Sequence, residues 1–367
     1  MVDSHGSGAI LTIDVGAVVA NYRTLQARLG PVPCAAVVKA DAYGLGLAEV
    51  APALAAAGCT TFFVAHLGEG VALRAHLPSP EIFVLSGPGE GEERIFEAHD
   101  LAPALNSLVQ IDRWARFCRE RGSRAAILHI DTGMSRLGLP EDEVERLAGD
   151  PGRLGGIDLR YVMTHLACPE ESNHPMNEAQ LAAFNAVRAR LPKMRASLAA
   201  SSAIFLGPRY HFDLARPGVA LYGANPTPDR PNPMRPTITL EAPILQLREI
   251  DPPRTVGYGA AHRVARRTKI ATIAIGYADG YLRSLSGRGL CHIAGHRVPV
   301  VGRVSMDLTT LDVTEVPASL IEPGRLVEVV GPNHPVDAVA EEAGTIAYEI
   351  LTGLGSRYRR RYVRGDA

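Results

Sequence analysis

From about residue 30 to residue 225 the chain repeats one pattern: a short apolar run, a loop, and then a segment with helical spacing of its apolar residues. Short apolar runs bounded by turn residues are typical of buried strands. They predict eight strands, at Ala35–Val38, Thr61–Ala65, Ile82–Leu85, Ala102–Leu105, Ala126–Ile130, Tyr161–Thr164, Arg195–Ala199 and Phe212–Ala215. The helical segments between them are Ala48–Ala57, Gly68–Ala75, Leu108–Arg121, Glu141–Leu147 and Asn177–Leu191.

Eight strands that alternate with helices predict a parallel (β/α)8 barrel, a TIM-like α/β fold. A doubly wound open sheet would give a similar alternation. However, no G-x-G-x-x-G motif follows the first strand, so the dinucleotide-binding form of that fold is disfavoured.

The pattern changes near Asn225, where five prolines (226, 228, 231, 233 and 236) interrupt a polar stretch that reads as a linker. Short β-rich runs then follow at strand-and-turn spacing, at Thr237–Leu247, Lys269–Ile275, Leu290–Ile293, Arg297–Val301, Leu308–Val313 and Arg325–Val330. A helix at Val336–Ala343 and a last strand near Arg360–Val363 complete the pattern. We therefore expect two domains, a barrel over residues 1–235 and a mainly β domain over residues 236–367.

Composition narrows the class of protein without identifying it. The 38 Lys and Arg residues nearly balance the 39 Asp and Glu residues, which gives no electrostatic case for nucleic acid or a membrane surface. The five cysteines are scattered without metal-ligand spacing, so neither a disulfide framework nor a metal site is expected. With no signal peptide and no long apolar run, the expected location is the cytoplasm.

Candidate chemistry collects at the carboxyl ends of the predicted strands, where barrels place reactive groups. The first strand ends at Lys39 with Tyr43 just beyond, and the fifth leads from His129 into a loop that carries Arg136. The last three strands end in His165, Ser201, Ser202, Arg216, Gly218 and Val219. Any one of these is more often a core histidine, a helix cap or a surface lysine, but their position at one rim favours a shared site.

The residue types at this rim suit one cofactor. The Gly218 and Val219 N–H groups, with the Ser202 and Tyr43 hydroxyls, would bind a phosphate at the last two strand ends, where barrels commonly hold one. Lys39 would hold an aldehyde as an imine. A phosphate cradle beside such a lysine predicts pyridoxal phosphate.

Six segments carry a resemblance that covers nearly the full length of the chain. They are Ala35–Gly44, Asp131–Gly138, Arg216–Gly223, Val256–Gly259, Ile275–Gly280 and Val301–Asp307. In sequence and order they resemble the alanine racemase family of fold-type III pyridoxal phosphate enzymes. The resemblance implies an isomerase that interconverts L-alanine and D-alanine and supplies D-alanine for peptidoglycan.

The resemblance also implies a two-base mechanism. Lys39 would hold the cofactor and act as one base, and Tyr258 would act as the other. Inversion at the α-carbon requires bases on opposite faces of the substrate, each within hydrogen-bond reach. A tyrosine has an unperturbed pKa near ~10, so the positive environment that His165 and Arg216 provide in the family would favour its phenolate.

The remaining site residues follow from the same resemblance. Arg216 would donate to the pyridine nitrogen, and Arg136 would contact the cofactor and the substrate carboxylate. Met306 and Asp307 would shape the carboxylate end of the pocket, with Tyr277 narrowing the entry. Because the two bases lie in different domains, the resemblance implies a head-to-tail homodimer with two equivalent sites.

Three positions depart from the commonest form of the family. His129 stands where many members carry a carbamylated lysine that holds the arginine matching Arg136, so a bound anion, a water network or a looser arrangement would replace it. Ser201 stands where an asparagine usually precedes the phosphate-binding serine. Ser356 stands where some members have a tyrosine that reaches the phosphate, which puts that contact in doubt.

Three alternatives remain beside alanine racemisation. A racemase of the same architecture could act on serine or a basic amino acid, and pocket volume would decide this. A non-catalytic pyridoxal phosphate carrier would lack the second domain. A decarboxylase of the same plan would carry a carboxylate at the pyridine nitrogen, where this chain has Arg216, and a reactive cysteine in its second domain, where Cys291 has no recognisable context.

Overall fold

The computed structural model describes residues 8–365, which form two compact units. One unit runs from Val18 to Arg235, and the other contains the chain from Pro236 onward together with the N-terminal segment up to Ala17. The N-terminal segment was expected in the barrel. It lies in the second unit because β1 (Ile10–Asp14) pairs with β9 (Ile238–Ile250) and with β17 (Arg359–Val363).

The first unit is built on seven parallel strands in sequential order. They are β2 (Ala36–Val37), β3 (Thr61–Val64), β4 (Glu81–Val84), β5 (Ala102–Leu105), β6 (Arg124–His129), β7 (Ile157–Met163) and β8 (Arg195–Ser197). Sequential parallel strands require a crossover between each pair, and the helices of this unit supply it.

The eighth member of the barrel is irregular. The predicted strand Phe212–Ala215 is not a regular strand, and Phe212 has a left-handed backbone with φ of 53°. The segment nevertheless bonds to both edges of the sheet: Asp213 N donates to Ala196 O at 2.9 Å, and Ala215 N donates to Pro33 O at 3.0 Å. These bonds close the sheet, and the (β/α)8 barrel expected from the sequence is confirmed.

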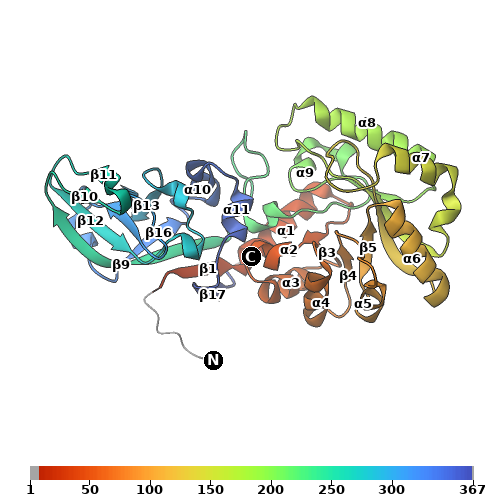
Figure 1. Ribbon diagram of the computed structural model, residues 1–367, viewed down its shortest axis with the longest axis horizontal. Coiled ribbons are helices and arrows are strands. Elements are labelled where there is room, and N and C mark those ends of the chain that lie inside the picture. The colour runs from red at the N-terminus through yellow and green to blue at the C-terminus, as the bar shows by residue number, and fades with distance from the viewer. Residues whose placement is uncertain (1–7, 366–367) are drawn as a thin grey trace. The chain divides into compact units, whose positions relative to one another are not determined.

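Helices cover the outside of the barrel strands (Figure 1). They are α1 (Val15–Leu29), α3 (Leu47–Ala56), α4 (Leu67–His76), α5 (Glu93–Ala98), α6 (Leu108–Arg121), α7 (Glu141–Gly149), α8 (Pro175–Arg190) and α9 (Ala203–Leu206). Helix α6 shows why these segments are helical and pack on the strands. Leu108, Ile111 and Trp114 recur at helical spacing and are buried. Ser107 caps the helix by accepting a hydrogen bond from Gln110 N. Helices α1, α5 and α9 were not predicted.

A short left-handed turn, α2 (Lys39–Tyr43), follows β2. Ala40, Asp41 and Ala42 have φ of 53–54° and ψ of 50–51°, and Tyr43 continues with φ of 55°. Residues with a Cβ atom occupy this region at a cost of about 1–2 kcal/mol each. Four in succession therefore require strong anchoring by their surroundings.

The second unit is mainly β, as predicted. Its eight-stranded sheet contains β1, β9, β12 (Thr268–Ile273), β13 (Leu290–Ile293), β14 (His296–Pro299), β15 (Thr309–Asp312), β16 (Leu326–Val330) and β17. A small hairpin, β10 (Thr255–Val256) with β11 (His262–Arg263), and two helices, α10 (Val336–Ala343) and α11 (Ala347–Thr352), complete it. No helix in the described part of the chain is long and apolar enough to span a membrane.

Candidate functional site

Lys39 follows β2 at the carboxyl rim of the barrel and is half-buried. Burial lowers the pKa of its ammonium group, the nearby Arg136 cation lowers it further, and the Glu69 carboxylate opposes both. A lysine with a lowered pKa has a larger fraction of neutral amine near pH 7. The neutral amine is the form that attacks a carbonyl or accepts a proton.

Arg216 lies in the segment that closes the barrel, and its guanidinium group is buried and anchored. Nη1 donates to the Ser197 hydroxyl and Nη2 donates to Thr164 O at 2.8 Å. Burial lowers the pKa of Arg216 to about 10, so the group remains a cation at neutral pH. The barrel therefore holds a fixed positive charge at this rim.

His165 follows β7, and its pKa is affected by the positively charged side chains at the rim. Burial lowers its pKa to about 3, and the positive charges of Arg216, Arg136 and Lys39 act in the same direction. Arg216 Nη2 donates to the carbonyl oxygen of Thr164, the residue before His165, so these two expected site residues are neighbours. The charges of Lys39 and Arg136 also act on His165. His165 itself is neutral near pH 7, so Lys39, Arg136 and Arg216 are the groups that make this rim attractive to an anion.

His129, at the end of β6, is buried and neutral. Burial, with the Arg216 charge, lowers its pKa to about 4. Its Nδ1 lies 2.7 Å from Asn106 Oδ1, while Asn106 Nδ2 donates to Leu85 O and Ala104 O. Because the oxygen of Asn106 can only accept, Nδ1 carries the ring proton and Nε2 is left as an acceptor.

The loop that carries Arg136 is held by a single carboxylate. Asp131 Oδ1 accepts hydrogen bonds from the backbone N–H groups of Gly133 and Met134, both at 2.9 Å, and of Ser135 at 3.2 Å. The side chain of Arg136 itself is exposed. A fixed loop with an exposed guanidinium group can present that group to a bound anion.

In one respect the loop that carries Gly218 differs from the phosphate cradle expected from the sequence. The Gly218 N–H, expected to face the phosphate, donates instead to Ser201 Oγ at 3.0 Å, and Ala220 N donates to the same oxygen at 3.2 Å. Among the described residues, no hydrogen bond involves the Val219 N–H or the buried Ser202 hydroxyl. The Val219 N–H, the Ser202 hydroxyl and the Ser201 hydroxyl proton therefore remain as donors for an anion.

Gly218 and Tyr43 are in close contact. A Cβ atom at position 218 would lie 2.3 Å from Tyr43 Oη, so only glycine fits there. Tyr43 is buried and stacks on Tyr222 with a centroid distance of 4.6 Å. The close approach of backbone to phenol defines one wall of the cradle.

Four residues that organise the rim were missed in the sequence: Glu69, Asn106, Gln180 and Ser197. Gln180, buried in α8, donates to Thr132 Oγ1 and to His165 O and so joins the loops after β6 and β7. These residues lie inside predicted helices or strand ends, where a polar side chain is ordinarily solvent-exposed or caps a helix. Their hydrogen-bond partners alone distinguish these four residues from ordinary surface or capping residues, and those partners are distant in sequence.

The other expected site residues lie in the second unit. Tyr258 is 70% exposed, and Met306 and Tyr277 are 53% and 42% exposed. Asp307 Oδ1 accepts from Arg357 Nη1 at 2.8 Å. The backbone N–H groups of Tyr277 and Ala278 donate to Ser305 O and Met306 O, so these two loops are neighbours. Ser356, the third departure, is exposed.

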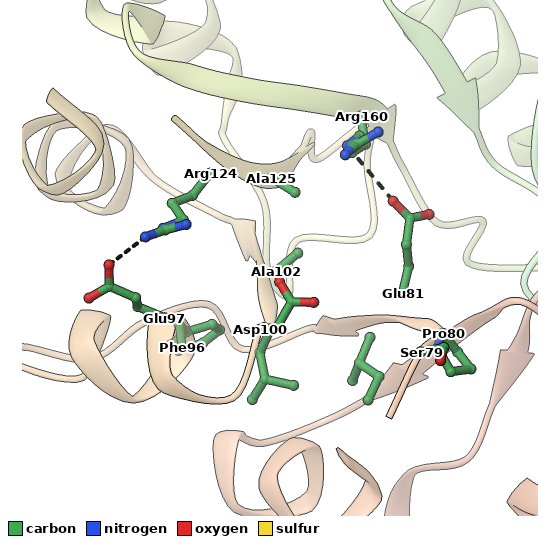
Figure 2. A pocket seen from close by; sticks show the side chains of 12 residues that line it. Ser79, Pro80, Glu81, Phe96, Glu97, Asp100, Ala102, Arg124, Ala125 and Arg160 are labelled. Carbon is green, nitrogen blue, oxygen red and sulfur yellow. Dashed lines mark hydrogen bonds and ion pairs between the residues drawn. The ribbon is translucent and has the colours of Figure 1, made fainter. Parts of the chain in front are cut away.

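A separate pocket lies at the opposite ends of the barrel strands (Figure 2). Its lining includes Glu81, at the start of β4, and Arg124, at the start of β6. Arg124 pairs with Glu97, and Arg160 pairs with Glu81. None of the expected site residues lines this pocket, so it is not the candidate site.

Comparison with known proteins identifies the family. The alanine racemase N-terminal domain matches residues 13–226, and the alanine racemase C-terminal domain matches residues 237–362. The chain belongs to the alanine racemase family.

Individual relatives match over nearly the whole chain. An alanine racemase from Rhodospirillum rubrum is 53% identical over 357 residues, 96% of either chain. One from Acidiphilium cryptum is 55% identical over 351 residues, 95% of this chain and 97% of that one. The crystal structure of a Bartonella henselae alanine racemase with covalently bound pyridoxal phosphate is 44% identical, with a TM-score of 0.94 and coverage of 97% and 99%.

The rim residues fit such a cofactor. A half-buried lysine suits its aldehyde, and the Val219 N–H with the Ser202 hydroxyl suits its phosphate. The wall formed by Gly218 and Tyr43 leaves no room for a side chain, as expected where backbone approaches a ligand closely. The buried Arg216 guanidinium group, held by Ser197 and Thr164, supplies a fixed donor at the same rim.

Proposed function

We propose that the protein is a pyridoxal phosphate-dependent isomerase, an alanine racemase that interconverts L-alanine and D-alanine. The observation that carries the proposal is the gathering of Lys39, Arg136, His165 and Arg216 at the carboxyl rim of the barrel. Alanine racemases at 53% and 55% identity over nearly the whole chain support the same reaction.

Lys39 would hold the cofactor, with its phosphate bound by the Ser202 and Tyr43 hydroxyls and the Val219 N–H. The Gly218 N–H is engaged by Ser201 Oγ, so Gly218 would contribute the close wall of the cradle and not a donor. When bound, pyridoxal phosphate would supply an electron sink that stabilises negative charge at the substrate α-carbon. Arg216, charged at neutral pH, would donate to the ring nitrogen and leave it unprotonated. An unprotonated ring nitrogen would make the cofactor a weaker electron sink, which would favour reprotonation of the α-carbon over side reactions.

Two bases would act on opposite faces of the substrate. Lys39 has a lowered pKa and can take up the α-proton as a neutral amine. Tyr258 would be the second base. Because His165 is neutral near pH 7, Arg216 is the charged group of this pair that would favour the phenolate.

The substrate carboxylate would be bound by Arg136, with Met306 and Asp307 at the same end of the pocket. The Asp307 carboxylate already engages Arg357, which keeps its charge compensated.

We also propose a head-to-tail homodimer, in which the barrel of one protomer and the β unit of its partner complete each site. Lys39 and Tyr258 belong to different units. The exposed fractions of Tyr258 and Met306, 70% and 53%, are high for large apolar side chains and support a surface that a second chain covers.

The first test is racemisation by the purified protein, followed from L-alanine and from D-alanine with a chiral assay. The proposal expects interconversion in both directions, loss of both by Lys39→Ala, and a loss mainly in one direction by Tyr258→Phe. Binding of pyridoxal phosphate without interconversion of alanine, serine or basic amino acids would favour a carrier. Interconversion of serine but not alanine would favour a serine racemase of the same architecture.

The cellular role we propose is supply of D-alanine for peptidoglycan in the cytoplasm. A bacterial strain without alanine racemase requires D-alanine for growth. The gene should remove this requirement, and a Lys39→Ala version should not.

A further inference from the structure

The left-handed turn after Lys39 is anchored by one carboxylate. Glu69 Oε1 accepts the backbone N–H of Ala40, the residue directly after Lys39, at 2.7 Å. Glu69 Oε2 accepts the N–H groups of Ala65 at 2.7 Å and of His66 at 3.1 Å. A single side chain therefore ties the end of β2 to the junction between β3 and α4.

The anchored segment has an unfavourable backbone conformation. Ala40, Asp41, Ala42 and Tyr43 all have left-handed backbones although none is glycine. Local backbone bonds within the turn include Gly44 N to Ala40 O at 2.8 Å. Asp41 Oδ1 accepts from Leu47 N at 2.7 Å. Within residues 8–365, Glu69 is the acceptor of the Ala40 N–H.

The same carboxylate is a charge beside the lysine. Lys39 lies among cations, and Glu69 is the anion that acts on it. A glutamine of the same shape has one acceptor oxygen instead of two, so it can serve one side of the bridge but not both, and it has no charge.

We propose that Glu69 is a positioning residue for Lys39, which fixes the left-handed turn that orients the lysine and offsets the positive charge around its amine. This inference rests on the proposed function only in taking Lys39 as the reactive lysine. Glu69 does not contact the reacting atoms; it acts through the backbone of Ala40 and through its charge.

The titration of Lys39 can be followed separately because the sequence has only three lysines, Lys39, Lys193 and Lys269. Competitive acetylation of the full chain, stripped of cofactor and followed by mass spectrometry across pH, gives the titration midpoint of Lys39. The exposed Lys193 serves as the internal reference. The holoenzyme is assayed in parallel for cofactor retained after dialysis.

Three variants separate charge from geometry. Glu69→Gln should move the Lys39 midpoint to lower pH by a few tenths of a pH unit or more and speed cofactor loss severalfold. Glu69→Asp keeps the charge but is too short to bridge, so its midpoint should stay near the wild-type value while cofactor loss quickens. Glu143→Gln is the matched control, because Glu143 also accepts a backbone N–H, that of Leu108 at 2.9 Å, away from Lys39.

An unchanged midpoint in Glu69→Gln, or an equal shift in Glu143→Gln, would overturn the charge role. Wild-type cofactor retention in both Glu69 variants would overturn the anchoring role. If Glu69→Gln does not fold, Glu69→Asp still tests the anchor. A wild-type protein that binds no pyridoxal phosphate would refute the proposed function, whereas the Lys39 midpoint would still test Glu69.

Discussion

His129 Nδ1 donates a hydrogen bond to Asn106 Oδ1 across 2.7 Å, and both side chains are buried. The amide nitrogen of Asn106 is committed to two backbone carbonyl groups, so its orientation is fixed. The position that a Cβ on Gly138 would occupy lies 3.2 Å from His129 Cδ2, which puts this edge of the ring against the loop that carries Arg136. A neutral imidazole with Nε2 as acceptor thus lies beneath that loop.

Replacing Asn106 with alanine should destabilise the protein. The variant leaves the buried Nδ1–H group of His129 without its acceptor and removes two hydrogen bonds to backbone carbonyl oxygens, for a loss of about 3 kcal/mol in the free energy of unfolding. Urea unfolding of wild type and variant at pH 7 measures this. Asn185→Ala, at an exposed amide, is the control and should change stability by about 0.5 kcal/mol or less. Equal losses in the two variants would contradict the buried network.

The buried histidines should make the protein acid-sensitive. The pKa of His129 is about 4 in the folded protein, against about 6.5 for an exposed imidazole, so the unfolded chain takes up the proton first as the pH falls. The contribution of His129, at most about 3 kcal/mol, is complete above pH ~6.5 and is lost as the pH falls toward 4.

Urea unfolding at pH 7 and pH 5 should reveal this loss, about 2 kcal/mol from His129 alone. His129→Asn should reduce the difference in stability between the two pH values. His76→Asn, at an exposed histidine, should not. The same pH dependence in wild type and His129→Asn would show that His129 is not the source.

Adding a methyl group at Gly218 should disturb the cofactor cradle. The new Cβ would meet Tyr43 Oη at 2.3 Å, and Tyr43 cannot move freely because it stacks on Tyr222. Gly218→Ala should cost about 1–3 kcal/mol in stability and weaken retention of pyridoxal phosphate. Gly149→Ala, where a Cβ meets nothing within 4 Å, is the control. Wild-type retention in Gly218→Ala would argue against the cradle.

Mixed dimers test whether each site draws on two chains. Lys39→Ala and Tyr258→Phe should each be impaired alone. If the sites are shared head to tail, mixing the unfolded variants and refolding them together should restore one intact site in each heterodimer, about a quarter of wild-type activity. Absence of any recovery, with heterodimers demonstrated by mass spectrometry, would refute the shared site.

Much of the fold could be predicted because the local pattern and the tertiary structure agree. Residues Ala102–Leu105, Leu290–Ile293 and Leu108–Arg121 were predicted with the bounds the structure gives. The errors lie where partners are distant in sequence. Strand β1 is defined by its pairing with β9 and β17, and the eighth barrel strand is replaced by a segment that begins with a left-handed Phe212.

The rim residues Lys39, Arg136, His165 and Arg216 could be predicted because they follow strand ends. Their supporting residues could not. No glycine marks residues 40–43, so nothing local indicates a left-handed turn there. Asn106, Glu69 and Ser197 are ordinary polar residues until their tertiary partners are known.

Strand β1 lies between β9 and β17 in the sheet, although more than 200 residues separate it from the first and more than 300 from the second. In topological terms the barrel is an insertion within the β unit. During synthesis β1 leaves the ribosome before either of its partner strands. The edge of β1 that pairs with β17 stays unpaired until β17 has been translated. The barrel can close early, whereas the eight-stranded sheet acquires β17 only after the barrel and the segment that carries Tyr258 have been translated.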